Sequence, residues 1–207
     1  DEVQLCLSGV FHAGTQPGGA DDSLLHNIKN VWSADDVYYP CRGIPERFRG
    51  HCYSHAAGRS RSNDFSVTFG VCNNIPEKDV SKKRDYVQRC YDSAANPLLL
   101  ATVKASDLNE KEKIVKVVDS CKNYALPEFR RYCYGGAVRY WVLFEPSVEN
   151  VRPFEICRLV EEDAKSVCYG SIGFGNNENY YDKNLRAKYC SNAEKKFFED
   201  CLFMRAK

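Results

Sequence analysis

Apolar residues recur at helical spacing along most of the chain, and the clearest stretch runs over residues 107–145. One helical face in its first half carries four such positions: Ile114, Val117, Val118 and Cys121. A second helical face follows after a short polar break: Phe129, Cys133, Gly136, Ala137, Tyr140, Trp141 and Phe144. Residues three and four positions apart are neighbours on a helix, so this stretch predicts two helices joined by a short turn.

Helix-start signals precede both halves of this stretch. Asp107 offers an N-cap with Glu110 three residues later, which is the capping-box arrangement. Pro127 restarts the helix, since proline is preorganised for the first helical position, and the acid that follows it complements the helix dipole. The same proline–acid pair occurs at Pro45 and at Pro76, which indicates that the helix–turn–helix plan is repeated.

Cysteines mark the period of this repeat. Six of them open a short motif, at intervals of 33 to 46 residues: Cys6, Cys52, Cys90, Cys133, Cys168 and Cys201. A partner precedes all but the first by 11 to 18 residues: Cys41, Cys72, Cys121, Cys157 and Cys190. Most motif cysteines are followed by a tyrosine and, three residues on, by a small residue. Self-similarity in this range is typical of an array of supersecondary units.

The spacing predicts disulfides within each hairpin. In the clearest unit, one cysteine lies at the end of the first helix and the other about a turn and a half into the second. Antiparallel helices can bring such positions within the roughly 4.4–6.8 Å that a disulfide requires between Cα atoms. The expected pairs are Cys41–Cys52, Cys72–Cys90, Cys121–Cys133, Cys157–Cys168 and Cys190–Cys201. A competing register would run from Cys6–Cys41 to Cys168–Cys190. Local pairing instead leaves Cys6 as a free or intermolecular thiol.

These expectations give an all-α protein, a single solenoid-like domain over residues 1–207 built from about five disulfide-stapled helical hairpins. Its approximate units are an incomplete N-terminal unit at 1–40, followed by 41–71, 72–106, 107–150, 151–189 and 190–207. The recurring tyrosine and small residues indicate core and interhelix packing rather than a binding stripe. Segment 170–175 is rich in glycine like a phosphate loop, but no predicted strand precedes it, and we expect a helix break before Asn176.

The plan resembles that of the Sel1-like, cysteine-rich helical repeat proteins, in which disulfide-closed α-hairpins stack into a curved solenoid. The resemblance spans Cys41 to Cys201 and is one of architecture, so it carries over no functional residue. It implies a scaffold that binds partners outside the cytoplasm.

Cysteine usage favours an oxidising compartment. No two of the 11 cysteines lie closer than 11 residues, which argues against close-pair zinc sites, C-x-x-C redox motifs and c-type haem attachment. Disulfides remain, and they predict a periplasmic or extracellular protein. The chain starts at Asp1 without an apolar leader, which fits a mature product whose signal peptide has been removed.

Charge and hydropathy narrow the range of partners. The net charge is +1, from 29 basic and 28 acidic residues, so no global field favours nucleic acid or an anionic membrane. No run of about 18 apolar residues predicts a membrane span, so we expect membrane contact only through a partner.

His51 and His55 are the candidate metal ligands. Their i, i+4 spacing places both imidazoles on one side of a helix, where they could share a metal ion or a haem iron. The metalloprotease motif uses this spacing with a glutamate beside the first histidine, but Cys52 stands there. The alternative is a packed or surface pair, with no cofactor.

Five arginines surround the first complete unit: Arg42, Arg47, Arg49, Arg59 and Arg61. Two interpretations of this basic patch stay open, a solvated surface paired with nearby acids and a contact for an acidic protein partner.

The leading hypothesis is a non-catalytic extracytoplasmic scaffold for protein–protein interaction, an accessory subunit of a larger, membrane-associated complex. The chain has no catalytic motif, which favours a protein without enzyme activity, although an enzyme whose site is not recognisable from motifs is an alternative. A further alternative is a metal- or haem-binding electron-transfer accessory protein that uses His51 and His55.

Overall fold

The computed structural model describes residues 36, 38–39, 41–43, 45–58, 64–75, 80–147, 149–179 and 182–204. Within these ranges, the side chains of residues 46–48, 51, 80–85 and 176–179 are left undescribed. The described chain is helical and contains no strand, which confirms the predicted all-α class for this part of the protein. In the same ranges, no helix combines the length and apolar character needed to cross a membrane.

The α-helices within these ranges are α3 (Glu46–Ala57), α4 (Phe65–Asn73), α5 (Val80–Lys104), α6 (Glu110–Tyr124), α7 (Arg130–Phe144), α8 (Arg152–Leu159), α9 (Lys165–Asn179), α10 (Lys183–Cys190) and α11 (Phe198–Phe203). Short 3-10 helices are η1 (Cys41–Gly43), η2 (Pro127–Phe129), η3 (Glu162–Ala164) and η4 (Lys195–Phe197).

Five disulfides divide these helices into hairpins. We number the hairpins 1 to 5: η1 with α3, α4 with α5, α6 with α7, α8 with α9, and α10 with α11. The bonded pairs are Cys41–Cys52, Cys72–Cys90, Cys121–Cys133, Cys157–Cys168 and Cys190–Cys201, with Cα atoms 5.5 to 5.7 Å apart. They are the pairs that the spacing predicts, and all ten cysteines are buried. Cys6 lies outside the described residues.

The start of α6 corrects the expected cap by two residues. Asn109, not Asp107, is the N-cap: its side-chain oxygen accepts a hydrogen bond from the backbone N–H of Glu112 at 3.0 Å. The Glu112 carboxylate in turn accepts from the backbone N–H of Asn109 at 2.8 Å. Because α6 begins at Glu110, the acid at the third helical position is Glu112, and the capping box closes there.

The same backbone turn precedes the second helix of three hairpins, namely α7, α9 and α11. Leu126, Glu161 and Glu194 each precede a 3-10 turn, with φ of −58° or −59° and ψ between 137° and 148°. Each accepts a hydrogen bond at its carbonyl from the amide three residues later, at 2.8 to 2.9 Å. Pro45, before α3, has φ −52° and ψ 138°. The repeat therefore extends to the backbone angles.

A buried tyrosine follows the motif cysteine in the second helices α3, α5, α7 and α9, and in two of them it bonds to the next hairpin. Tyr53, Tyr91, Tyr134 and Tyr169 are at most 5% exposed, which confirms the packing interpretation of this series. The Tyr91 hydroxyl accepts from the backbone N–H of Leu126 at 3.3 Å, and the Tyr169 hydroxyl donates to the Glu194 carboxylate at 3.0 Å. Leu126 and Glu194 are both turn residues of the following hairpin.

The aromatic residue four positions before a motif cysteine also bridges hairpins. Tyr91 stacks on Phe129 with ring centroids 5.6 Å apart, and Tyr169 stacks on Phe197 at 5.2 Å. In both pairs the tyrosine belongs to one hairpin and the phenylalanine to the next. The tyrosine–phenylalanine contact between hairpins 2 and 3 therefore recurs between hairpins 4 and 5.

Glycine lets neighbouring second helices touch through their backbones. A Cβ atom at Gly136 on α7 would lie 2.8 Å from the Cα atom of Asp92 on α5. One at Gly173 on α9 would lie 2.8 Å from the carbonyl carbon of Cys201 on α11.

Segment 170–175 lies inside α9, which continues to Asn179, so the expected helix break before Asn176 is wrong. These glycines serve close helix packing rather than a turn.

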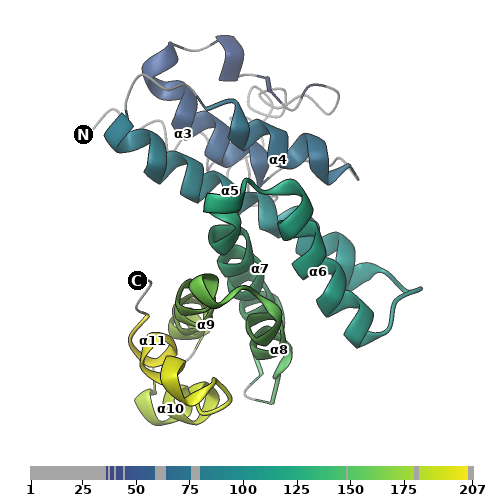
Figure 1. The fold of residues 1–207 in the computed structure, drawn as a ribbon, viewed down its shortest axis with the longest axis vertical. Helices are drawn as coiled ribbons and strands as arrows, with labels where there is room; N and C mark the ends of the chain where they lie inside the picture. Colours follow the sequence, from purple (N-terminus) through teal and green to yellow (C-terminus); the bar gives the residue numbers. More distant parts are fainter. Residues whose placement is uncertain are drawn as a thin grey trace, which may run out of the picture.

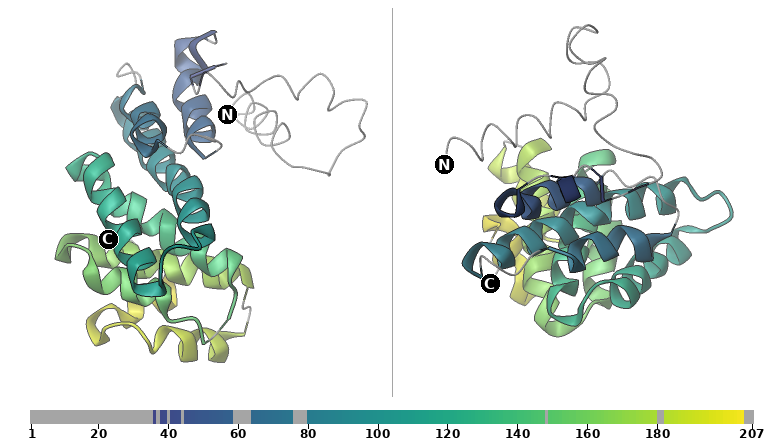
Figure 2. Two further views of the ribbon diagram at one scale, coloured as in Figure 1. Left: turned by 90° about the vertical axis from the view of Figure 1, so that its right-hand side faces the viewer. Right: turned by 90° about the horizontal axis from the view of Figure 1, so that it is seen from above.

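The second helices contact one another in chain order (Figures 1 and 2). Helix α3 packs on α5, α5 on α7, α7 on α9 and α9 on α11, while α4 packs on α6 and α6 on α8. Figure 1 shows this order from α3 at the top of the view to α10 and α11 at the bottom. One hydrophobic core cluster contains residues of all five hairpins. The hairpins therefore form one continuously packed body.

Candidate interaction surface

Both histidines of the expected metal site belong to α3. His55 is half-buried, and the side chain of His51 lies outside the described residues. Cys52, between them, is engaged in a disulfide. Among the side chains that the structure describes, no group of three or more histidine, cysteine, aspartate or glutamate residues is placed to hold a metal ion. The histidine site stays a prediction.

The structure places two arginines of the expected basic patch. Arg42 on η1 is exposed; one guanidinium nitrogen lies 3.7 Å from the Asp36 carboxylate, and the group lies 4.5 Å from the centroid of the Tyr38 ring. Arg49 on α3 is half-buried. The remaining members lie outside the description: the side chain of Arg47, and Arg59 and Arg61. Arg42 therefore has an acidic neighbour, while the extent of the patch stays a prediction.

A different arginine occupies the centre of an aromatic surface on the second helices. The Arg139 guanidinium forms an ion pair with Asp92 of α5. It also lies 5.0 Å from the ring centroid of Tyr140 and 5.7 Å from that of Phe174 on α9. Tyr140 stacks on Phe144 with centroids 6.0 Å apart. We call these five residues, Asp92, Arg139, Tyr140, Phe144 and Phe174, the Arg139 surface.

Two rings of the Arg139 surface are open to solvent. Phe144 is 49% exposed and Phe174 is 45% exposed, although phenylalanine is among the residues most often fully buried. Single exposed apolar residues need no explanation, but Phe174 lies near the Arg139 guanidinium and Phe144 stacks on Tyr140, so the two rings belong to one cluster across two hairpins. Aromatic and arginine side chains are the groups enriched at the energetic centres of protein interfaces. The Arg139 surface therefore contains residue types that are common in protein interfaces.

Backbone contacts hold the Arg139 surface in place. Gly136 packs against the backbone of Asp92 just before Arg139 in α7. A Cβ atom at Gly175, next to Phe174, would lie 2.9 Å from the carbonyl oxygen of Arg139. Close contacts therefore fix α5, α7 and α9 relative to one another where the surface crosses them.

Burial sets the electrostatics of this surface. Desolvation raises the pKa of Asp92 to about 6, while the Arg139 guanidinium acts in the opposite direction. Desolvation is the larger of the two effects, because loss of water disfavours the charged carboxylate more than the Arg139 cation favours it. Asp92 is therefore ionised and paired with Arg139 at neutral pH, and its carboxylate becomes protonated in mild acid.

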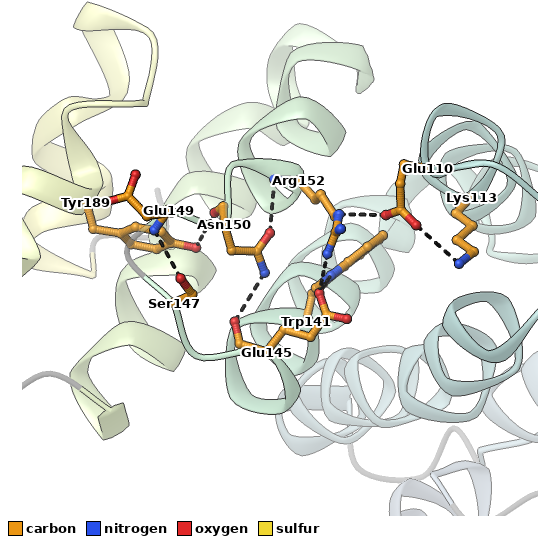
Figure 3. Close-up of polar contacts among 9 residues, drawn as sticks. All are labelled: Glu110, Lys113, Trp141, Glu145, Ser147, Glu149, Asn150, Arg152 and Tyr189. Atoms are coloured by element: carbon orange, nitrogen blue, oxygen red, sulfur yellow. Dashed lines mark hydrogen bonds and ion pairs between the residues drawn. The ribbon is translucent and has the colours of Figure 1, made fainter.

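A polar network anchors the end of α7 (Figure 3). One terminal guanidinium nitrogen of Arg152 lies 2.6 Å from a carboxylate oxygen of Glu145, and its Nε atom lies 2.6 Å from a carboxylate oxygen of Glu110. The indole N–H of Trp141 donates to the same Glu145 oxygen at 2.9 Å. Glu145 directly follows Phe144, so the network positions this edge of the Arg139 surface. Lys113 pairs with Glu110 at 3.3 Å, so two cations balance two carboxylates in this network, which fits a structural role.

An open groove with a volume of about 440 Å³ runs along α6. Its lining residues all belong to this helix: Lys111, Glu112, Val115, Lys116, Asp119, Ser120, Asn123 and Tyr124. Charges of both signs alternate along it, and one helix supplies every lining residue. Small-molecule sites are enclosed by several elements, so this groove does not have the form of an active-site pocket.

Sequence reasoning did not single out the Arg139 surface, although the repeat contains a signal for it. Arg139 and Phe174 both lie six residues after a motif cysteine, and Asp92 lies two residues after Cys90. Positions two and six share one helical face, because residues four apart are neighbours. The sequence therefore predicts this face when the repeat units are aligned up to the sixth residue after each motif cysteine.

Comparison with known proteins adds no assignment. No family model, curated protein or solved structure matches the chain. The resemblance to Sel1-like repeats therefore stays an expectation from the sequence, which no comparison supports.

Proposed function

We propose that the protein is a non-catalytic, extracytoplasmic helical-repeat scaffold that binds another protein. In this proposal it is an accessory subunit of a larger, membrane-associated complex, and its hairpins form a solenoid-like array. The binding site is the Arg139 surface.

The solenoid proposal is supported by a recurring step between second helices. The residue two positions after one motif cysteine meets the residue three positions after the next. Asp92 meets Gly136 in this way, and Gly135 meets Ser171, whose hydroxyl oxygen lies 2.6 Å from the position of a Cβ atom at Gly135. A constant step between units generates a solenoid, and solenoids present extended surfaces to partners.

The observation that carries the binding proposal is the exposure of Phe144 and Phe174 in the cluster of rings around Arg139. These rings come from hairpins 3 and 4, so a partner that covers them would contact two successive units of the array. Buried aromatic and arginine anchors supply most of the binding energy in protein interfaces.

The proposed compartment is the periplasm or the extracellular space. Five disulfides are typical of proteins from oxidising environments, since cytosolic thiols are kept reduced. None of the helices among the described residues has the length and apolar character of a membrane span, and in this proposal the membrane association comes from the partner.

We expect the double variant Phe144→Ala, Phe174→Ala to lose most of its native partner in a quantitative pulldown from the native source. Truncating interface anchors typically weakens binding by about 2 kcal/mol or more each, equivalent to roughly 30-fold. The matched control is Leu159→Ala, Leu185→Ala, which removes apolar side chains that are 56% and 41% exposed on the first helices. Both variants should keep the wild-type melting temperature, because all four side chains are substantially exposed.

Two outcomes would contradict this proposal. One is retention of the stoichiometric partner by the phenylalanine variant at the wild-type level. The other is a monomer in light scattering that turns over a defined substrate, since a scaffold has no turnover.

A further inference from the structure

The two charged residues of the Arg139 surface are bound to each other. Asp92 lies on α5 and Arg139 on α7, and each side chain of this ion pair is 24% exposed. Gly136 brings the α7 backbone against the backbone of Asp92, so the pair forms where the two helices touch. Most surface ion pairs join long, mobile side chains, whereas the helix contact fixes the position of this one. The guanidinium is therefore neutralised within the protein.

The carboxylate at the edge of the Arg139 surface is also paired internally. Glu145 directly follows Phe144 in the chain, and its carboxylate accepts a hydrogen bond from the Arg152 guanidinium at 2.6 Å. The indole N–H of Trp141 donates to the same carboxylate oxygen at 2.9 Å, as Figure 3 shows. Neither Arg139 nor Glu145 therefore presents an uncompensated charge to a partner.

Aromatic rings supply the most exposed part of the Arg139 surface. Phe144 and Phe174 are 49% and 45% exposed, whereas Tyr140, on which Phe144 stacks, is half-buried. The rings come from α7 and α9, whose backbones are in contact where a Cβ atom at Gly175 would lie 2.9 Å from the Arg139 carbonyl oxygen. Because the two helices are already fixed relative to each other, a partner would not have to order them on binding.

A charged partner segment would gain little at such a surface. An acidic segment would meet a guanidinium that Asp92 already neutralises, and a basic segment would meet a carboxylate that Arg139 already neutralises. Either segment would lose water from its charge without forming a new ion pair, and the desolvation of an uncompensated charge is costly. An apolar segment has no such cost and would remove the exposed area of both phenylalanine rings from water.

We propose that Asp92 determines the specificity of the Arg139 surface: by neutralising Arg139 within the protein, it selects a partner segment whose contacting face is apolar and uncharged. This inference rests on the proposed binding function and adds the chemistry of the partner. Asp92 discriminates against acidic segments, because without its charge the guanidinium would attract them.

A random dodecapeptide phage library, panned at pH 7.5 on immobilised wild-type protein, tests this chemistry directly. Prior depletion on the variant Phe144→Ala, Phe174→Ala removes peptides that bind elsewhere on the molecule. The enriched peptides should be rich in leucine, methionine and aromatic residues and poor in charged ones. The same selection on Asp92→Asn should enrich aspartate and glutamate. Enrichment of charged peptides by wild type, or no enrichment above the depleted background, would overturn the proposal.

Fluorescence anisotropy with the most enriched peptide measures the role of the ion pair. Its affinity for wild type should change by less than about twofold between about 0.05 M and 0.5 M NaCl, because salt screens mainly exposed charges. Asp92→Asn should bind this peptide about tenfold more weakly, since an unpaired guanidinium would lose water in the complex. Adding Arg139→Gln to Asp92→Asn should recover most of the loss, because the unpaired cation is then removed. Undiminished binding by Asp92→Asn, or a further loss in the double variant, would overturn the role of Asp92.

Thermal melting followed by circular dichroism shows whether the Asp92 variants fold. The library selection and the salt series on wild type decide the chemistry of the partner even where a variant does not. Selection of charged peptides by wild type, alongside loss of the native partner by the phenylalanine variant, would overturn this inference and leave the proposed function standing. Retention of the native partner by the phenylalanine variant would instead contradict the proposed function itself.

Discussion

Complete reduction of the five disulfides is expected to unfold the protein or to loosen it greatly at 25 °C. Each bridge closes a loop of 11 to 18 residues, for which the chain-entropy model gives about 3 kcal/mol. Domains of ordinary stability have only about 5–15 kcal/mol of net free energy of unfolding. The measurement is far-ultraviolet circular dichroism during heating, before and after reduction and alkylation of the thiols.

Alkylation without reduction is the control for this experiment, since it leaves the buried disulfides intact. A helical signal and a melting temperature that are the same before and after full reduction would contradict the prediction. Such a result would mean that packing between hairpins stabilises the fold without the bridges.

Gly136→Ala is expected to be among the most destabilising single substitutions in the described part of the chain. The new Cβ atom would lie 2.8 Å from the Cα atom of Asp92 and closer still to its carbonyl oxygen, and neither backbone atom can rotate away. Overpacking of this kind costs about 1–3 kcal/mol. For a chain of this size, that lowers the melting temperature by roughly 2–4 °C per kcal/mol.

Gly70→Ala is the matched control, because Gly70 also lies inside a helix, α4. The nearest atom to its Cβ position outside its own helix is the Tyr38 hydroxyl oxygen at 3.6 Å, an ordinary contact distance. Alanine should therefore stabilise α4 by up to about 1 kcal/mol through its higher helix propensity. Effects of the same sign and size at both glycines would contradict the close-packing role of Gly136.

The hairpins and their disulfides could be predicted because their signals are local. A cysteine partner 11 to 18 residues away, a proline at a helix start and an apolar stripe all act within one unit. Errors appeared where neighbouring candidates compete: Asp107 and Asn109 are both good N-caps, and only the observed start of α6 at Glu110 decides between them.

Contacts between hairpins were harder to predict. The glycines of α9 suggested a break because glycine is common at helix ends, but a neighbouring helix explains them better. The pairing of Asp92 with Arg139 depends on the step from one hairpin to the next, which the sequence of a single unit does not contain. The proposed roles of the histidine pair and of the arginines around α3 remain predictions.

Non-reducing peptide mapping of the native protein tests the central claim most directly, because the repeat of disulfide-closed hairpins underlies every other inference. Five cross-linked peptides are predicted, each joining the two helices of one hairpin, from Cys41–Cys52 to Cys190–Cys201. A peptide that joins Cys52 to Cys72 would link two different hairpins and would contradict the account.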